Sequence, residues 1–387
     1  MEIKIKELGK IITGNTPSKT VAEFWNSEDI CFVKPDIISE KGVNEILGSK
    51  EYISEKARKK ARIVSENSIF ITCIGSIGKI GIASEGEYAF NQQINAIVPN
   101  EKVNPRYLAY ALFFNRPRLI DIANAPVVPI INKNQFGDFI INIDSDVNRQ
   151  IEIAGVLDKL VNIIELREKE LSVLDDLIKA RFVELFGDAV DNPMGWEKKQ
   201  LQEIVTDDCT ISYGIVQTGN DQEEGVPVFR PVDIVNRIPK LEELKRTTEE
   251  ISNKYKRTIL KGHEMLITVR ANIADTCIVG KEFKGCNVGR GIVPIRTQEN
   301  IMVLEFLKYL MDSKHLNDDI KSKAKGITLI QLNMEDLREV ELIVPPIEQQ
   351  KAFVEFAEQV NKSKVAVQKA LDETQLLFDS LMQQYFG

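Results

Sequence analysis

Residues 148–186 read NRQIEIAGVLDKLVNIIELREKELSVLDDLIKARFVELF. It contains no proline and only one glycine, Gly155, and apolar residues recur every seven positions from Leu157 to Leu185. A heptad pattern sustained over this length predicts a single α-helix that presents an apolar seam to a partner helix. At 1.5 Å per residue, the helix is expected to be about 58 Å long.

A second stretch of the same kind closes the chain. It begins after Pro345-Pro346, a pair that disfavours helix before it, and both stretches end in Phe-Gly, at 186–187 and at 386–387. Two equal helices are expected to pack as an antiparallel pair within the chain, although a seam between two chains stays open as the alternative. The predicted seam residues are Leu157, Ile164, Leu171, Ile178 and Leu185 in the first helix and Val360, Val367, Leu371 and Phe378 in the second.

The two helices belong to an internal repeat of about 200 residues, too long for a solenoid. Residues 71–77 align with 267–273, residues 33–37 align with 230–234, and Asn91 then falls opposite Asn287. The expected organisation is a first lobe over 1–146, a helix over 147–187, a second lobe over 188–345 and a helix over 346–387. Each half of the chain is therefore expected to be one lobe followed by one helix.

Each lobe is expected to be α+β, with a mixed or antiparallel sheet. Residues 68–74 and 79–83 are predicted to be paired strands around a turn, and residues 264–269 and 276–279 repeat the pattern. Helices are expected near residues 105–116 and 302–314. The fold class is therefore two tandem, pseudo-symmetric α/β lobes, separated and closed by two long helices that form an antiparallel coiled coil.

The composition is that of a globular protein in a reducing compartment. No apolar run could span a membrane, and the N-terminus lacks the apolar core of a signal peptide, so we expect a cytoplasmic protein. The five cysteines form no C-x-x-C pair and are expected to be reduced thiols. His263 and His315 have no ligand partner at useful spacing, so no metal site is predicted.

The formal net charge of −8 counts against a broad nucleic-acid-binding surface. The first lobe is neutral overall, and the second carries a net charge of −4. Any DNA contact is therefore expected to come from local loops, with further positive charge supplied by partner proteins.

The motifs of self-contained enzymes are missing. There is no G-x-x-x-x-G-K-[ST] phosphate loop and no G-x-S-x-G nucleophile elbow. Residues 192–195 lack the second proline and the aromatic residue of the adenine-methyltransferase tetrad, and residues 75–78 are too short for a dinucleotide loop. Asp36 with Glu40 loosely matches a nuclease carboxylate site, but solvated surface is the commoner explanation. We therefore predict no catalytic residue in this chain.

Polar side chains beside the predicted turns are better candidates, as DNA contacts. Amide groups pair with adenine, and guanidinium groups pair with guanine or phosphate. The alternative for each residue is that it is merely solvated or caps a turn. The candidates are Lys34, Ser76, Lys79, Asn91, Gln92 and Gln93 in the first lobe, and Tyr213, Gln217, Arg230, Arg270, Asn272 and Arg290 in the second.

Over its whole length the chain resembles the specificity subunits of bacterial and archaeal type I restriction–modification systems. The resemblance rests on Thr16-Pro17-Ser18, on the segments 192–197 and 211–217, on Pro345-Pro346-Ile347-Glu348-Gln349-Gln350 and on the Phe-Gly ends. The first copy departs at residues 144–150, which lack the prolines. An Asp or Ser there can still cap the helix.

The resemblance implies that each lobe reads one half of a split double-stranded DNA target and that the helix pair fixes the unread spacer. It also implies two modification subunits, which methylate adenine with S-adenosylmethionine, and two restriction subunits, which translocate and cut DNA with ATP and Mg. No cofactor is expected on this chain. A duplicated chain would offer two equivalent docking faces to a methyltransferase dimer, on its exposed helix surfaces.

Two other function classes stay open. A self-contained methyltransferase or nuclease would bind S-adenosylmethionine as an isolated chain. A scaffold without a DNA role would show no DNA binding even with modification subunits present.

Overall fold

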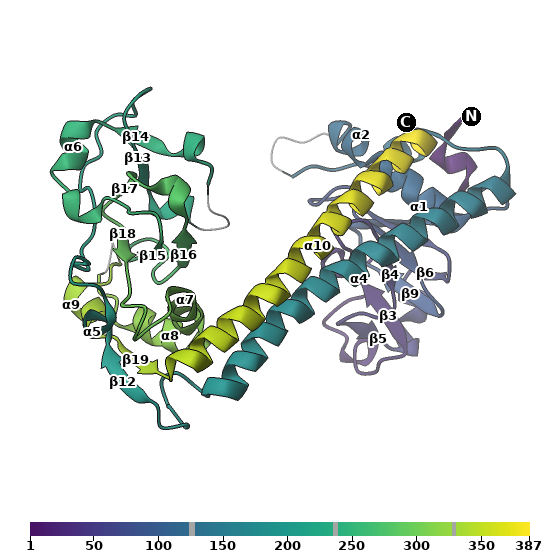
Figure 1. Cartoon of the computed structure of the whole chain (residues 1–387). Coiled ribbons are helices and arrows are strands. Elements are labelled where there is room, and N and C mark those ends of the chain that lie inside the picture. Colours follow the sequence, from purple (N-terminus) through teal and green to yellow (C-terminus); the bar gives the residue numbers. More distant parts are fainter. Residues whose placement is uncertain (124–127, 235–238, 327–329) are drawn as a thin grey trace. The chain divides into compact units, whose positions relative to one another are not determined.

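The computed structural model describes residues 1–123, 128–234, 239–326 and 330–387. The chain forms two compact units (Figure 1): unit 1 is Met1–Lys169 with Gln368–Gly387, and unit 2 is Glu170–Val367. Each unit combines one sheet-bearing lobe with parts of two 40-residue helices, α4 (Val147–Phe186) and α10 (Ile347–Phe386). The α+β class predicted from the sequence is confirmed.

The long helices pack antiparallel within the chain. In unit 1, Leu157 of α4 lies in the same buried cluster as Phe378 of α10. In unit 2, Phe182 and Phe186 of α4 lie against Phe353 of α10, with ring centroids 5.4 and 5.6 Å apart. The early part of each helix therefore pairs with the late part of the other, as the teal and yellow ribbons of Figure 1 show.

Polar residues that interrupt the seam bind one another. In unit 1 the Arg167 guanidinium donates to the carbonyl of Ala370 and to the hydroxyl of Thr374. In unit 2 Lys364 forms an ion pair with Asp175. The seam is therefore apolar toward the helix ends and polar in between. Among the predicted seam residues, the buried ones are Leu157, Ile178, Val360 and Phe378, and the half-buried ones are Ile164, Leu171, Leu185, Val367 and Leu371.

The described strands of unit 1 form three sheets. A five-stranded sheet has the order β2-β10-β7-β8-β4, a four-stranded sheet has the order β5-β3-β9-β6, and β1 pairs with β11. Only the pairs β4–β8 and β3–β9 are parallel among these described strands, so the lobe is mixed. The strands are β1 (Glu2–Lys4), β2 (Gly9–Thr13), β3 (Ile30–Val33), β4 (Val43–Ile46), β5 (Tyr52–Ile53), β6 (Ile63–Ser65), β7 (Ile69–Thr72), β8 (Ile80–Ala83), β9 (Glu87–Phe90), β10 (Ile94–Pro99) and β11 (Ile140–Asn142), and the shorter helices are α1 (Pro105–Phe114), α2 (Arg116–Asp121) and α3 (Lys133–Asp138).

Unit 2 repeats this plan with smaller sheets. Their strand orders are β16-β15-β18, β14-β13-β17 and β12-β19. Only β13–β17 is a parallel pair among the described strands, and it corresponds to β3–β9 of unit 1. The strands are β12 (Glu197–Gln200), β13 (Val226–Phe229), β14 (Lys245–Thr247), β15 (Glu264–Thr268), β16 (Thr276–Val279), β17 (Asn287–Val288), β18 (Ile292–Ile295) and β19 (Glu341–Val344), and the helices are α5 (Leu201–Ile204), α6 (Glu249–Asn253), α7 (Leu304–Asp312), α8 (Lys314–Ser322) and α9 (Met334–Arg338).

Equivalent backbone hydrogen bonds fix how the two lobes correspond. The amide of Asn91 donates to the carbonyl of Val33 at 3.2 Å, and the amide of Gly289 donates to that of Phe229 at 2.8 Å. Asn91 therefore corresponds to Gly289, and Val33 corresponds to Phe229. The expected alignment of residues 33–37 with 230–234 is therefore wrong by one residue. The expected match of Asn91 with Asn287 is wrong by two residues, because the loops between the strands differ in length in the two lobes.

The start of each long helix is tied to its lobe by a buried glutamine. The Gln350 amide oxygen accepts the backbone N–H of Val303 at 2.9 Å. Its nitrogen donates to the carbonyls of Ile301 and Pro345 at 3.0 and 2.8 Å. Gln150 makes the equivalent three bonds in unit 1, to Asn104, Lys102 and Asp144.

The first helix needs no proline to begin. The Asp146 carboxylate accepts the backbone N–H of Asn148 at 2.9 Å, which is the capping predicted for this departure from the family pattern. No helix within the described parts of the chain has the length and apolar character needed to cross a membrane.

Candidate nucleic-acid interface

The turn between β9 and β10 carries three of the predicted residues of unit 1. Asn91 is buried, and its amide nitrogen donates to the amide oxygen of Gln93 at 2.9 Å. Gln92 is exposed between them, and its amide oxygen accepts from the hydroxyl of Thr16 at 2.8 Å. Asn91 and Gln93 therefore shape this turn, and Gln92 presents an amide at its tip.

The lysines predicted in unit 1 are engaged in ion pairs. Lys34 pairs with Glu51, and Lys79, whose side chain is 12% exposed, pairs with Glu40 at 3.1 Å. Ser76 lies exposed on the β7–β8 turn, where its carbonyl accepts from the hydroxyl of Thr72. These residues brace the turns, and their contact with DNA stays a prediction.

Two of the arginines predicted in unit 2 also have internal partners. Arg230 binds both carboxylate oxygens of Asp233, at 2.9 and 3.1 Å, and these hydrogen bonds raise the pKa of its guanidinium. Arg270 donates to the amide oxygen of Gln331. Both guanidinium groups are held in place, but each keeps donors that face away from its partner.

Arg290 differs from them. It is exposed on the turn between β17 and β18, and it forms no hydrogen bond or ion pair with any described residue. The structural correspondence of Asn91 with Gly289 makes Arg290 the counterpart of Gln92. The same turn tip therefore carries an amide in unit 1 and a guanidinium in unit 2.

The structure gathers the arginine-bearing turns of unit 2 in one place. A Cβ atom at Gly291 would lie 2.4 Å from Cγ of Pro231 and 3.4 Å from Cβ of Arg270. The segment that leads to Gln217 joins them, because the amide of Ile215 donates to the carbonyl of Val288 at 2.8 Å. The exposed residues Gln217, Asn272 and Tyr213 lie on these or the adjoining turns.

Sequence reasoning missed a group of cations beside this cluster. Lys256 and Arg257 are exposed, and neither has an ion-pair partner among the described residues. The signal was present as local charge density: residues 254–261 contain four basic and no acidic side chains, although the chain is acidic overall. The net charge of the whole second lobe is negative and does not reveal this short basic segment.

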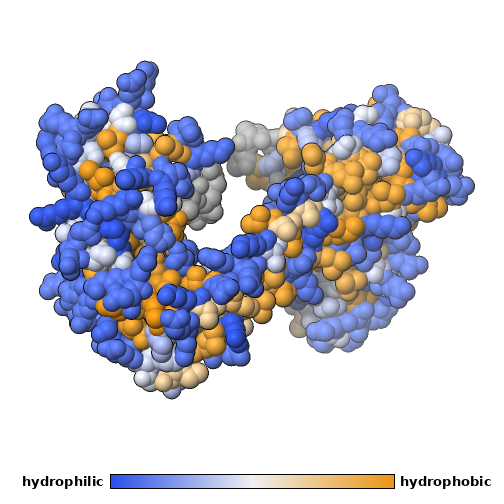
Figure 2. Space-filling view, viewed as in Figure 1, coloured by the Kyte–Doolittle hydropathy of each residue, from blue (hydrophilic) through white to orange (hydrophobic). Residues whose placement is uncertain are grey.

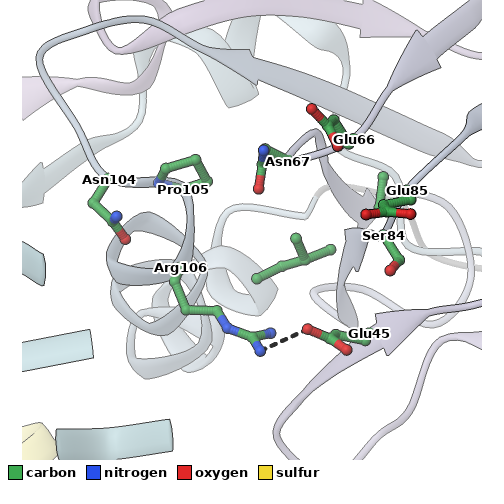
Figure 3. A pocket seen from close by; sticks show the side chains of 10 residues that line it. Glu45, Glu66, Asn67, Ser84, Glu85, Asn104, Pro105 and Arg106 are labelled. Atoms are coloured by element: carbon green, nitrogen blue, oxygen red, sulfur yellow. Dashed lines mark hydrogen bonds and ion pairs between the residues drawn. The ribbon is translucent and has the colours of Figure 1, made fainter. Parts of the chain in front are cut away.

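One pocket of unit 1, of about 270 Å³, is unsuited to a polyanion (Figure 3). Glu45, Glu66 and Glu85 line it. Arg106, its basic residue, is already bound to Glu45 at 2.7 Å and to Asp158 at 3.2 Å. Carboxylates around a paired arginine would repel a phosphate, so this pocket fits neither the DNA backbone nor ATP.

Two groups with possible metal or thiol chemistry have plain structural explanations. His315 was expected to lack a ligand partner, but folding brings its Nδ1 within 2.8 Å of Asp188, and Asp191 is nearby. Asp188 also caps the backbone amides of Val190 and Asp191, so a local turn and an ion pair account for the group. All five cysteines are free and buried, and burial raises the pKa of the Cys73 thiol to about 12.

Comparison with known proteins identifies the family. The model of the type I restriction modification DNA specificity domain matches residues 1–175 and 193–374. The EcoBI specificity subunit of Escherichia coli is 26% identical over 191 residues, which are 49% of this chain and 40% of that protein. The chain thus spans less than half of that relative's length.

Other similar proteins match over most of the chain. The MjaIX specificity subunit of Methanocaldococcus jannaschii is 26% identical over 375 residues, covering 89% of this chain and 82% of its own. The crystal structure of a type I restriction–modification S subunit from M. genitalium shares the fold, with a TM-score of 0.61 at 14% identity over 100% of this chain and 96% of that one. The chain belongs to the family of type I restriction–modification DNA specificity subunits.

Proposed function

We propose that this chain reads a bipartite DNA target for a type I restriction–modification complex, one half-site per lobe. The observation that carries the proposal is the exchange of Gln92 for Arg290 at equivalent turn tips, within equivalent backbone hydrogen bonds. Two related lobes can recognise different bases if they keep the same backbone hydrogen bonds and carry different side chains at the turn tip. An amide suits adenine, and a guanidinium suits guanine.

The helix pair is proposed to set the unread spacer between the half-sites. Each helix of 40 residues is about 60 Å long. Half-sites read from one side of a duplex repeat about every 34 Å, so helices of this length are sufficient for the task.

Docking of the modification subunits is proposed to use the exposed side of α4. Apolar side chains reach the surface along the helical segments in Figure 2. On α4 these include Ile163, Leu166, Val173 and Leu177, between 38% and 57% exposed, and helical periodicity places them on the side away from the seam. Exposed apolar stripes of this kind mark protein interfaces.

We expect the double variant Leu166→Glu/Val173→Glu to bind its modification subunit roughly 10²- to 10⁴-fold more weakly, because each of the two buried aliphatic side chains contributes about 1.5–3 kcal/mol. Titration by mass photometry measures the loss. Ser172→Glu adds a charge elsewhere on the same helix and is the matched control. Equal affinity of the double variant and the control would place the dock on another surface.

Catalysis is proposed to reside in the partners. Two modification subunits would use S-adenosylmethionine, and two restriction subunits would use ATP and Mg, as the family resemblance implies. This chain would contribute recognition and alignment, because the motifs of a phosphate loop and of an adenine methyltransferase are missing from its sequence.

The decisive experiment is methylome sequencing of DNA from cells that express the cognate modification subunit with and without this chain. We expect a split motif with a fixed gap, methylated only when the chain is present. Methylation that does not depend on the chain would contradict the proposal and favour a scaffold.

Arg290→Ala tests the proposed reader of unit 2. It is expected to lose about 1–3 kcal/mol of discrimination at one base pair of one half-site and to leave the other half-site unchanged. Competition among duplexes that carry single base changes measures this loss. Lys314→Ala removes an exposed charge elsewhere in unit 2 and serves as control. An unchanged base preference at every position of the target would show that Arg290 does not contact a base.

A further inference from the structure

A cleft of about 410 Å³ in unit 2 combines cations with aromatic rings. It is lined by Ser212, Tyr213 and the segment Asn253–Thr258. That segment supplies Lys254, Lys256 and Arg257, and none of the described residues that line the cleft is acidic. Because the second lobe carries a net charge of −4, a wall with three cations is a marked departure from its surroundings.

The cations of the cleft are not equally free. Lys254 is bound to Glu250 at 2.9 Å, one helical turn away. Lys256 and Arg257 are exposed, without an ion-pair partner in the described part of the chain. Two unpaired cations at consecutive positions of the cleft lining are available for an anionic ligand, and the hydroxyl of Ser212 and the rings of Tyr213 and Tyr255 line the same cleft.

Both walls of the cleft are fastened to the strand that carries the Arg290 turn. The buried Asn287 side chain accepts from the Thr258 hydroxyl at 2.7 Å and donates to the Ser252 hydroxyl at 2.9 Å. On the other wall, the amide of Ile215 donates to the carbonyl of Val288 at 2.8 Å. Since β17 leads directly into this turn, the cleft and the proposed base reader are positioned by one strand.

Unit 1 has a related arrangement. Residues 56–62 contain five basic and no acidic side chains, and Lys59 and Lys60 are exposed. The Asn15 amide nitrogen donates to the carbonyl of Lys60 at 2.7 Å, which holds this segment against the loop that contacts Gln92. A basic segment therefore lies beside the turn tip in both units.

We infer that this cleft binds backbone phosphates of the DNA duplex, with Lys256 and Arg257 as phosphate contacts that position the neighbouring turn for base reading. The inference rests on the proposed function, since the ligand is taken to be the DNA that the chain reads. Phosphate contacts fix register and orientation but carry no sequence information. Their loss should weaken binding without changing the motif.

The test compares the wild-type complex with modification subunits and the complex containing Lys256→Ala/Arg257→Ala. The probes are a fluorescent duplex with the methylated motif and a scrambled duplex. We expect weaker binding of both duplexes, with the slope of log affinity against log salt reduced by about 2, roughly 0.9 per lost contact. The methylated motif should stay the same.

Lys281→Ala/Lys284→Ala removes the same charge from exposed lysines outside the cleft and should leave the slope unchanged. A slope equal to wild type in the cleft variant, or a changed motif, would overturn the inference. The inference would also be overturned if the cleft variant lost binding of inorganic phosphate but kept the wild-type slope of log DNA affinity against log salt. The cleft would then be a site for free phosphate. If the wild-type complex shows no motif-dependent binding, the proposed function itself fails.

Discussion

Exchange of residues 188–345 for the corresponding segment of a family member with another target is expected to replace one half of the methylated motif and to leave the other half unchanged. The proposed readers of unit 2 lie on turns within this segment, and the bonds that hold them also lie within it. Each mismatched base pair costs about 1–3 kcal/mol, so the old half-site should be abandoned completely. Methylome sequencing reads both halves in one experiment.

The exchange must preserve the contact between the lobe and its helices. Phe306 of α7 lies against Phe186 of α4, with centroids 4.9 Å apart, and faces Phe353 of α10 at 6.2 Å. The incoming segment should therefore keep an aromatic residue at this position. The reciprocal exchange of residues 1–146 is the matched control and should alter only the other half. A change in both halves, or in the gap, would mean that the lobes do not read independently.

Gln350→Ala is expected to destabilise unit 2 by about 3 kcal/mol. The side chain is fully buried, and its loss leaves the Val303 amide and two carbonyls without partners; an unsatisfied buried group costs about 1–3 kcal/mol. For a unit of this size, a loss of this magnitude lowers Tm by roughly 6–12 °C. Calorimetric melting of the purified chain measures the shift.

The neighbouring residue supplies the control. Gln349 is exposed, so Gln349→Ala changes the same residue type without breaking the buried bonds. Gln150→Ala should produce the corresponding loss in unit 1. Equal Tm values for the Gln350→Ala and Gln349→Ala variants would show that the buried glutamine does not tie the helix to the lobe.

The features that local residue patterns encode could be predicted without the structure. Forty residues without proline, with apolar positions every seven, are enough to specify α4, because helical hydrogen bonds form within the segment. The strands around the turns of residues 73–79 and 269–275 were equally legible, since alternation and turn residues act over a few positions. The duplication was visible because residues 71–77 match residues 267–273 and because both long stretches end in Phe-Gly.

Which candidate side chains have internal partners, and which are free to bind DNA, depends on contacts that form on folding. Lys34, Lys79 and Arg230 looked like Arg290 in the sequence, but their carboxylate partners are fixed by folding. The same holds for the pairing of Arg167 with Thr374, which are 207 positions apart. The partners of an ion pair or a side-chain hydrogen bond follow no sequence period, so the local pattern does not predict them.

The correspondence of Gln92 with Arg290 was also visible only in the structure. Matching identical residues placed Asn91 opposite Asn287, whereas the backbone hydrogen bonds place it opposite Gly289. A strand register is set by pairing with neighbouring strands, and loops of unequal length shift it without leaving a mark in the residues themselves. The sequence therefore determined that there are two lobes and two helices, and the pairing of distant strands decided which residues occupy equivalent places in them.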